Sequence, residues 1–447
     1  MNTPICDFAR RYAQSGALRL HMPGHKGVSL LGMEALDVTE IDGADSLYEA
    51  DGIIRESEEN ASMLFGCPTY YSTEGSSQCI RAMLYLALLH AKAAGKRPLI
   101  AAGRNAHKTF LSAAALLDLD VAWLTAAQQE SYLCCALDAV RLEEQLTAMK
   151  ETPAAVYITS PDYLGHMLDV RALAQVCHRH GVLLLVDNAH GAYLRFMEPS
   201  CHPMDLGADL CCDSAHKTLP ALTGAAYLHI SEKHPRLIAQ VKNALAMFGS
   251  TSPSYLILQS LDAVNVCLAD GYRESLSALC ARVHALRKRL LAHGYTLRGD
   301  EAIKLTIEAK PYGYTGRELA EELFERRIVA EFADPDFVVL MFTPQISEAD
   351  FARLEAALLA IAWRLAVADV PPAFSQPRRM MSIREAALMP AEQVPVKKAV
   401  GRVLAAASVG CPPAVPIAVC GEEIDEAAAR CFAYYGVTAC TVVANQK

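Results

Sequence analysis

The stretch AAVYITSPDYLGHMLDVRALAQVCHRHGVLLLVD, residues 154–187, indicates how the chain folds. Two runs in it, residues 154–159 and 182–187, are apolar up to their last residue, and the segment between them has a helical period that ends at Gly181. Strands without polar alternation are typical of a parallel sheet, in which both faces are buried. The intervening helix is then the crossover connection that parallel strands require.

The same alternation of helix and apolar strand is present on the N-terminal side of this stretch. The predicted elements are a helix at about 77–94, a strand at 97–103, a helix at 107–119 and a strand at 121–125. We therefore predict an α/β fold with a mostly parallel central sheet that is covered by helices on both faces.

The pattern changes near Gly271, where a long charged helix leads into shorter strands and helices typical of a smaller α+β domain. Before residue 61 the chain is rich in Gly, Asp and Glu and has little helical or strand period, which indicates an extended arm. The predicted parts are an N-terminal arm at 1–60, a large domain at 61–270, a small α+β domain at 271–370, and a linker with a C-terminal domain at 371–447.

The composition excludes several classes of protein. The net charge is −9 and no Lys/Arg-rich run is present, which argues against nucleic acid as a partner. The longest aliphatic run, Val182–Val186, is far too short to span a bilayer, and the N-terminus lacks a signal-peptide core. The 15 cysteines include no CxxC pair and no metal-ligand cluster. We expect a soluble, cytoplasmic protein with reduced cysteines and no metal.

Residues suited to chemistry follow several predicted strands, and open α/β sheets bind ligands at such strand ends. Gly75-Ser76-Ser77 begins a helix, where hydroxyls and backbone N–H groups can bind a phosphate. A plain helix cap is the alternative for these serines. His107 follows the strand at 97–103 and could stack on a planar ligand, although a lone histidine is also a common cap.

The next strand end carries Asp187, followed by Ala189 and His190. A buried carboxylate needs a cationic or hydrogen-bonding partner, or its pKa rises; helix capping is the alternative role. Lys217 lies in CCDSAHKTLPALTGAAYLHI, residues 211–230, on a short loop between two strand-like segments. A partly desolvated lysine amine is the nucleophile that forms Schiff bases, and an ordinary loop charge is the alternative.

Together these features describe a pocket for pyridoxal phosphate. The serines at the helix N-terminus would hold the phosphate, and Lys217 would form the Schiff base. Asp187 would keep the pyridine nitrogen protonated, so that the ring can act as an electron sink.

The segment DSAHKTLPALT, residues 213–223, resembles the cofactor-lysine motif of the Orn/Lys/Arg decarboxylases, pyridoxal phosphate enzymes of the aspartate aminotransferase fold (fold type I). Further segments stand in the order of that family. They are HMPGHKG (21–27), GRNAHKTF (103–110), DNAHGAYL (187–194) and STSPSYLILQSLDA (250–263). The chain resembles the short, biosynthetic type that lacks the N-terminal receiver-like domain.

The resemblance implies decarboxylation of arginine, ornithine or lysine in polyamine biosynthesis, by a homodimer with shared active sites. Lys217 would be the Schiff-base lysine, with Asp187 on the pyridine nitrogen. His107 would stack on the ring, with Ala189 on its opposite face and His190 beside it. Lys217 or His216 would return a proton to Cα. The residues implied to hold the phosphate are Ser76, Ser77, Ser214, His216 and, from the neighbouring subunit, Ser250.

Two positions and the C-terminal motif, which reads PPAVPIAVCGEE (412–423), depart from the family's pattern. Asp162, in SPDYLGH, stands where a threonine or another neutral residue is usual, and the extra carboxylate could affect substrate preference. Gly224 stands where a glutamine is common. A basic substrate also needs a carboxylate at the far end of the pocket, unless the acidic residues only form a solvated face. The candidates are Glu422, in CGEEI, and the N-terminal residues Asp42, Asp45, Glu49 and Asp51.

Three alternatives to decarboxylation remain from the residues. The same fold supports aminotransfer and β-elimination on a different amino acid. A class I aldolase would use Lys217 without a cofactor. A binding or regulatory relative would keep the fold without catalysis, although it would have no evident reason to keep Lys217, Asp187 and His107 together.

Overall fold

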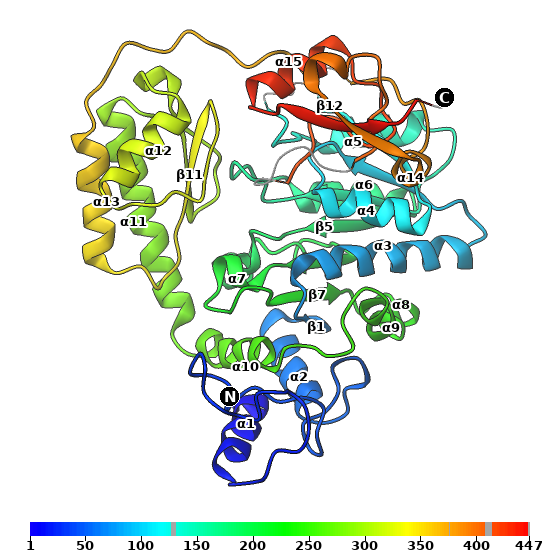
Figure 1. Cartoon of the computed structure of the whole chain (residues 1–447), viewed down its shortest axis with the longest axis vertical. Helices are drawn as coiled ribbons and strands as arrows, with labels where there is room; N and C mark the ends of the chain where they lie inside the picture. Colours follow the sequence, from blue (N-terminus) through cyan, green and yellow to red (C-terminus); the bar gives the residue numbers. More distant parts are fainter. Residues whose placement is uncertain (127–130, 375, 407–413, 446–447) are drawn as a thin grey trace. The chain divides into compact units, whose positions relative to one another are not determined.

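The computed structural model describes residues 1–126, 131–374, 376–406 and 414–445 (Figure 1). The chain divides into two compact units, each built from two separate stretches. Residues 1–96 and 173–275 form the first unit, and residues 97–172 and 276–447 form the second. The four predicted domains are each continuous in sequence, and their boundaries stay a prediction.

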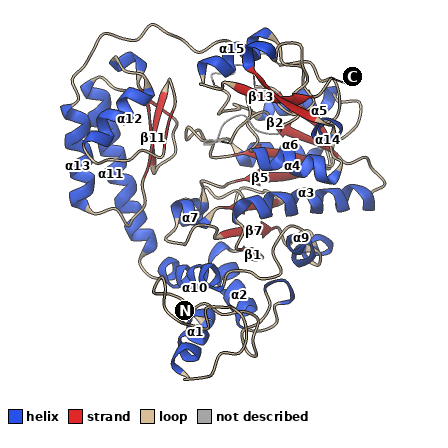
Figure 2. Ribbon diagram, in the orientation of Figure 1, coloured by secondary structure: helices blue, strands red, loops and turns tan. Residues whose placement is uncertain are grey.

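The central sheet has seven strands in the order β1-β7-β6-β5-β4-β2-β3 (Figure 2). Its pairs β2–β3, β2–β4 and β5–β6 are parallel, and only β7 pairs antiparallel, with β1 and β6, among the printed registers. The predicted mostly parallel α/β fold is confirmed. The strand bounds are β1 Thr69–Ser72, β2 Leu99–Gly103, β3 Asp120–Leu124, β4 Ala155–Thr159, β5 Leu183–Asp187, β6 Leu210–Asp213 and β7 Ala226–Ile230.

The stretch at 154–187 folds as its pattern predicts. Every residue of β5 is buried, which is why the strand is apolar up to its last residue, Asp187. Helix α6 spans Val170–Arg179, and Gly181 follows it with a φ of +64°. That left-handed conformation is readily available only to glycine, so Gly181 ends the helix and turns the chain into β5.

In the first unit, helix α3 (Gly75–Ala93) packs against β6, β7 and α9 (Val241–Ala246). Helix α2 (Ile53–Phe65) packs on β1 and on α10 (Tyr255–Ala269) (Figure 1). The short helices of this unit are α7 Ala215–Thr218 and α8 Pro235–Ile238. 

The prediction of an arm without regular structure is wrong for residues 4–14. They form helix α1 (Pro4–Gln14), which packs on α2 and α10. Ile5, Cys6 and Ala9 are its buried hydrophobic residues, and the proline stands in the first turn, where its missing N–H costs nothing. The apolar residues of α1 lie on one face, so the segment has an amphipathic period that the prediction of an arm overlooked, and packing on α2 and α10 buries that face.

In the second unit, a four-stranded antiparallel sheet has the order β10-β11-β9-β8. Its strands are β8 Thr296–Arg298, β9 Lys304–Glu308, β10 Phe332–Ala333 and β11 Phe337–Met341. The helices of this unit, and the one that leads into it, are α4 Lys108–Leu117, α5 Ala139–Ala148, α11 Tyr272–His293, α12 Gly316–Glu325, α13 Glu348–Ala360, α14 Ile383–Leu388 and α15 Glu426–Tyr434. Strand β10 is only two residues long. Strands β12 (Ala391–Pro395) and β13 (Ala439–Val443) pair near the C-terminus.

The cysteines within the described residues are free and most are buried, as the sequence predicts for reduced thiols. Among the described helices, none combines the length and the hydrophobicity that a membrane crossing requires. Residues 409–413, which begin the C-terminal segment VGCPPAVPIAVCGEEIDE, lie outside the described residues.

Gly224 should be needed for steric reasons. Its φ is +99°, and a Cβ there would lie 3.0 Å from the Thr73 carbonyl oxygen and 3.0 Å from Ile257 Cδ1. Gly95 also has a positive φ, +65°, but its Cβ would meet no atom within 4 Å. Gly224→Ala should therefore lower the free energy of unfolding by about 1–3 kcal/mol more than Gly95→Ala, as measured by urea denaturation. Equal losses in the two variants would contradict this steric argument.

Candidate active site

The carboxyl ends of β5 and β6, both in the first unit, carry most of the predicted site. Strand β5 ends at Asp187, and the following turn is closed by a hydrogen bond of 2.7 Å from the Gly191 N–H to the Asn188 carbonyl. Strand β6 ends at Asp213, and Ser214 then begins the short helix α7, which contains Lys217. Because the two strands are parallel neighbours, their ends lie at the same edge of the sheet.

These two strand ends bring Lys217 against His190. The Lys217 Nζ lies 3.0 Å from His190 Nε2, a hydrogen-bonding distance, and Lys217 is half-buried while His190 is buried. Lys217 is therefore not an ordinary solvated surface charge. Its amine is held beside a ring that can accept or donate a proton.

Asp187 is 2 % exposed. Its Oδ1 accepts the Ala189 N–H at 3.2 Å and the Cys212 thiol at 3.7 Å. The contacts from Ala189 and Cys212 orient the carboxylate at the strand end without a helix beginning there, so Asp187 is not a helix cap.

Hydroxyl groups from two segments meet at the first turn of α3. The Ser214 Oγ donates to the Ser76 Oγ at 2.8 Å, and Ser77 is the next residue of the same turn. The Gly75 N–H donates to the Gly224 carbonyl at 2.8 Å, which fixes where the helix begins. Hydroxyls gathered at a helix N-terminus are suited to an anion such as phosphate.

His216, next to Lys217, is also half-buried. Burial lowers the pKa of His216, and the Lys217 charge lowers it further, against the opposing effect of the hydrogen bond to Ala225. That bond joins His216 Nδ1 to the Ala225 carbonyl at 2.9 Å, so Nδ1 is the donor. Nε2 is then the nitrogen that can take up and release a proton.

The remaining predicted residues of the large-domain motifs lie in different surroundings. His107 is in the second unit, where its Nδ1 accepts the Thr109 N–H at 3.2 Å and caps helix α4. Ser250, in the first unit, is exposed, and its N–H donates to Glu74 Oε1 at 3.4 Å. Capping and stacking are compatible for His107, because a cap uses one edge of the ring and stacking uses its face.

Three of the carboxylates considered for the substrate, Glu422, Asp45 and Asp162, have partners within their own unit. Glu422 is buried and accepts from Arg104 Nη2 at 2.7 Å and from the Val419 N–H at 2.8 Å. Burial raises the pKa of Glu422, and the Arg104 guanidinium opposes that rise. The Asp45 carboxylate accepts backbone N–H groups that begin α2, including that of Gly52 at 2.9 Å. Asp162 accepts from His166 Nδ1 at 2.9 Å. Asp42, Glu49 and Asp51 are exposed.

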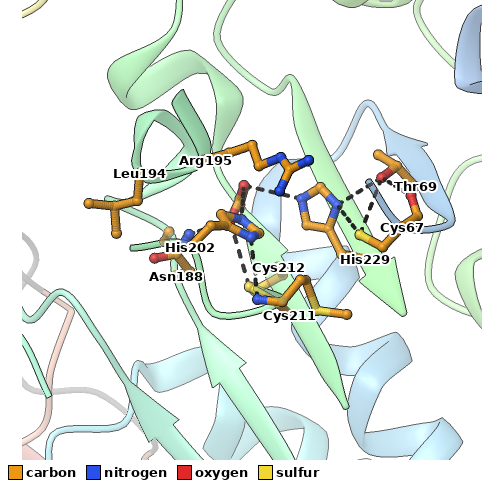
Figure 3. Close-up of polar contacts among 12 residues, drawn as sticks. Cys67, Thr69, Asn188, Leu194, Arg195, His202, Cys211, Cys212 and His229 are labelled. Carbon is orange, nitrogen blue, oxygen red and sulfur yellow. Dashed lines mark hydrogen bonds and ion pairs between the residues drawn. The ribbon is translucent and has the colours of Figure 1, made fainter. Parts of the chain in front are cut away.

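A buried carboxylate beneath the site was missed by sequence reasoning (Figure 3). Asp213 Oδ1 accepts from Asn188 Nδ2 at 2.7 Å, and Oδ2 accepts from His202 Nε2 at 3.0 Å and His229 Nε2 at 3.1 Å. Asp213, Asn188 and both histidines are fully buried. The His229 Nδ1 continues the network to Thr69 Oγ1 at 2.9 Å. We call these residues, Asn188, His202, Asp213, His229 and Thr69, the Asp213 network.

The Asp213 network connects four strands of the first unit. Asn188 directly follows Asp187 on β5, Asp213 directly precedes Ser214 on β6, and His229 and Thr69 belong to β7 and β1. Burial alone would raise the pKa of Asp213, but the two imidazoles hold it well below its usual range. The network therefore holds a charged carboxylate between the strand end that carries Asp187 and the loop that carries Lys217.

The family model described as the major domain of the Orn/Lys/Arg decarboxylases matches residues 3–299. The chain belongs to the Orn/Lys/Arg decarboxylase family. The expected resemblance is thereby confirmed, and the protein is a decarboxylase of the class that acts on basic amino acids.

Curated relatives of this decarboxylase cover nearly its whole length. An arginine decarboxylase of Bacillus subtilis (strain 168) is 29% identical over an alignment of 459 positions, which covers 95% of this chain and 91% of that protein. An arginine decarboxylase of Halalkalibacterium halodurans is 28% identical over 95% of this chain and 91% of its own length. Among solved structures, the lysine decarboxylase LdcF of Francisella novicida matches with a TM-score of 0.79 and 15% identity, over 99% of this chain and 81% of that one. This last likeness shows a shared fold.

Removing the charge of Asp213 should destabilise the decarboxylase strongly. Asp213→Asn would leave two buried imidazole N–H groups facing an amide that also donates. We expect a loss of about 3–5 kcal/mol in the free energy of unfolding at neutral pH. The control is Asp205→Asn, which breaks a partly exposed ion pair with Arg195 but keeps an amide oxygen for the Ser200 hydroxyl, and should cost less than about 1 kcal/mol. Equal losses in the two variants would contradict the role given to Asp213.

The deficit of Asp213→Asn should also depend on pH. Because the folded protein lowers the pKa of Asp213, the stabilisation is complete above the unfolded value of about 4 and is lost as the pH falls toward the lowered folded value. The difference in free energy of unfolding between the two proteins should therefore shrink on acidification below about pH 4. Urea denaturation at a series of pH values measures it, and a constant difference would show that the charge is not responsible.

Proposed function

We propose that this decarboxylase acts on arginine, with pyridoxal phosphate held at the carboxyl ends of β5 and β6. The observation that carries the proposal is the meeting of Lys217 and His190, 3.0 Å apart, at the strand ends that also carry Asp187 and Ser214. A nucleophilic amine, a buried carboxylate and an anion-binding helix terminus are the groups that this cofactor needs.

The chain's own residues fit the cofactor on chemical grounds. The Ser76–Ser214 hydroxyl pair, at the N-terminus of α3, suits the phosphate, with Ser77 beside it. Asp187 is a buried carboxylate suited to a protonated ring nitrogen. When bound, pyridoxal phosphate supplies an electron sink for the pair of electrons that the departing carboxylate leaves behind.

In this proposal, Lys217, His190 and His216 are the residues that transfer protons. Lys217 would hold the cofactor through its amine, which must be neutral to react, and His190 Nε2 lies near enough to exchange a proton with that amine. Either Lys217 or His216 would return a proton to the substrate Cα. His216 can serve because its Nδ1 is engaged by the Ala225 carbonyl and Nε2 remains for transfer.

Asp187 would hold the proton on the ring nitrogen, and the Asp213 network would keep Asp187 in place. The buried Asn188, which directly follows Asp187, donates from Nδ2 to Asp213 Oδ1. Ala189 and His107 are proposed to pack on the two faces of the cofactor ring, with His190 beside Lys217.

The choice of arginine among the basic amino acids is supported by the relatives. Four sequence relatives that cover at least nine-tenths of this chain are named arginine decarboxylase, at 25–29% identity, whereas the lysine decarboxylase structures match at only 15–19% identity. The guanidinium group prefers a carboxylate that can accept two parallel hydrogen bonds. Because Glu422 and Asp45 are engaged by Arg104 and by backbone N–H groups, the exposed Asp42, Glu49 and Asp51 are the proposed candidates for this contact. The product amine would enter polyamine biosynthesis.

We also propose that the active form is a homodimer, in which Ser250 reaches the phosphate of the neighbouring subunit. The segment 18–31 exposes several large apolar side chains. Leu18 and Leu20 are each 82% exposed, Leu30 is 81% exposed and Leu31 is 83% exposed. Such a group of apolar side chains is typical of a surface that another chain covers. Ser250 is itself exposed, as a contact with a second subunit requires.

The central test mixes the purified protein separately with arginine, ornithine and lysine and measures the release of carbon dioxide. We expect release from arginine and its loss to background in Lys217→Ala, because no other residue can supply the tethering amine. Lys233→Ala, which removes an exposed lysine of the same unit, is the control and should keep full activity. A yellow protein that releases nothing from any of the three amino acids would overturn the proposed function, and turnover that needs a keto acid would indicate aminotransfer.

The dimer is tested by charging the apolar segment. The double substitution of Leu30 and Leu31 by Asp should convert a dimer into monomers in sedimentation velocity, because the interface would have to bury two carboxylates. Leu365→Asp, at a leucine that is 81% exposed in the second unit, is the matched control and should leave the mass unchanged. A wild-type protein that sediments as a monomer would contradict the proposed assembly.

A further inference from the structure

Three side chains of metal-binding type meet in the second unit. Cys134 lies in the segment between β3 and α5, and Asp162 and His166 lie in the loop after β4. Their ligand atoms all lie within 4.8 Å of one another. The expectation that the sequence holds no metal-ligand cluster is wrong for these residues, because the fold brings Cys134 to a loop distant in sequence.

The loop that carries Asp162 and His166 is held rigidly. Asp162 Oδ1 accepts the N–H groups of Leu164 and His166, each at 2.9 Å, and its N–H donates to the His166 carbonyl at 3.0 Å. The Met167 N–H donates to Asp300 Oδ1 at 2.9 Å. Supporting hydrogen bonds of this kind orient metal ligands before the metal arrives.

All three side chains line one cavity of about 560 Å³. Asp138 and Asp300 line it as well, so three carboxylates face the cavity, and no Lys or Arg is present among the described residues that line it. The cavity therefore favours a cation, gives it a path of entry and leaves space for a water ligand.

We propose that Cys134, Asp162 and His166 bind a zinc ion, with a water from the cavity as the fourth ligand. A thiolate, an imidazole and a carboxylate form a donor set that suits Zn²⁺, whereas Mg²⁺ and Ca²⁺ prefer oxygen ligands alone. Tetrahedral zinc places its ligand atoms roughly 3–4 Å apart. Small side-chain movements would bring the three ligand atoms to these distances from one another. The Cys134 thiol loses its proton to solvent on binding.

The other cluster of this type, His202, Cys211 and Asp213, does not carry the same inference. Its three residues are fully buried, so a metal ion would have no path of entry to them. None of its members lines the cavity that Asp162 faces. The test of the zinc site does not depend on decarboxylation, because its readouts are zinc content and zinc affinity.

The test begins with the wild-type holoprotein. It is stripped with a chelator, dialysed against Zn²⁺ and then against metal-free buffer, and its zinc content is measured by mass spectrometry. We expect one zinc per chain. X-ray absorption at the zinc edge should show one sulfur at about 2.3 Å and nitrogen or oxygen ligands at about 2.0–2.2 Å. A protein that retains no zinc, or zinc without a sulfur ligand, would overturn the proposal.

Variants identify the ligands. Cys134→Ser, Asp162→Asn and His166→Gln should each weaken zinc affinity at least about tenfold in competition with a chromophoric chelator. Asp162→Asn keeps an oxygen for the two backbone N–H groups, so the loop should stay folded. Cys135→Ser is the matched control, because Cys135 is a buried neighbour that lines the same cavity but is not in the cluster. If Cys135→Ser weakens binding as much as Cys134→Ser does, or if none of the three ligand variants has an effect, the assignment fails.

Discussion

The arrangement of the site depends on the hydrogen bonds that the buried Asp213 carboxylate accepts. A charge with no exposed surface is tolerated only when its oxygens are fully hydrogen-bonded, and here Asn188, His202 and His229 supply the donors. These donors come from different strands and loops of the first unit. The strand end with Asp187 and the loop with Lys217 are therefore held by one buried group that cannot move without losing its partners.

The same physical rule decides the roles of the acidic residues elsewhere in the chain. A carboxylate that is removed from water takes a partner from its surroundings, as Glu422 takes Arg104 and Asp162 takes His166. Such residues stabilise their own loops first. A carboxylate that is to meet a substrate or a second subunit must keep its oxygens available, which favours the exposed acidic residues of the N-terminal segment.

Sequence patterns predicted the central sheet well because a parallel sheet imposes a simple rule on its strands. Strand β5 is buried on both faces, so its residues before Asp187 are apolar, and a glycine marks the end of the preceding helix. Helix α1 follows the rule for an amphipathic helix instead, with its buried residues on one face. That face packs on α2 and α10, which come from distant stretches of the chain.

By itself the sequence determined the α/β class, the position of Lys217 and Asp187 at strand ends, and the motifs that place the chain in its family, because these depend on local order along the chain. The tertiary structure decided which groups meet: Lys217 with His190, Ser76 with Ser214, and Asp213 with two histidines. It also brought Cys134 to Asp162 and His166. Contacts of this kind join residues far apart in sequence, and side-chain chemistry at one position carries no information about which distant partner the folded backbone will bring to it.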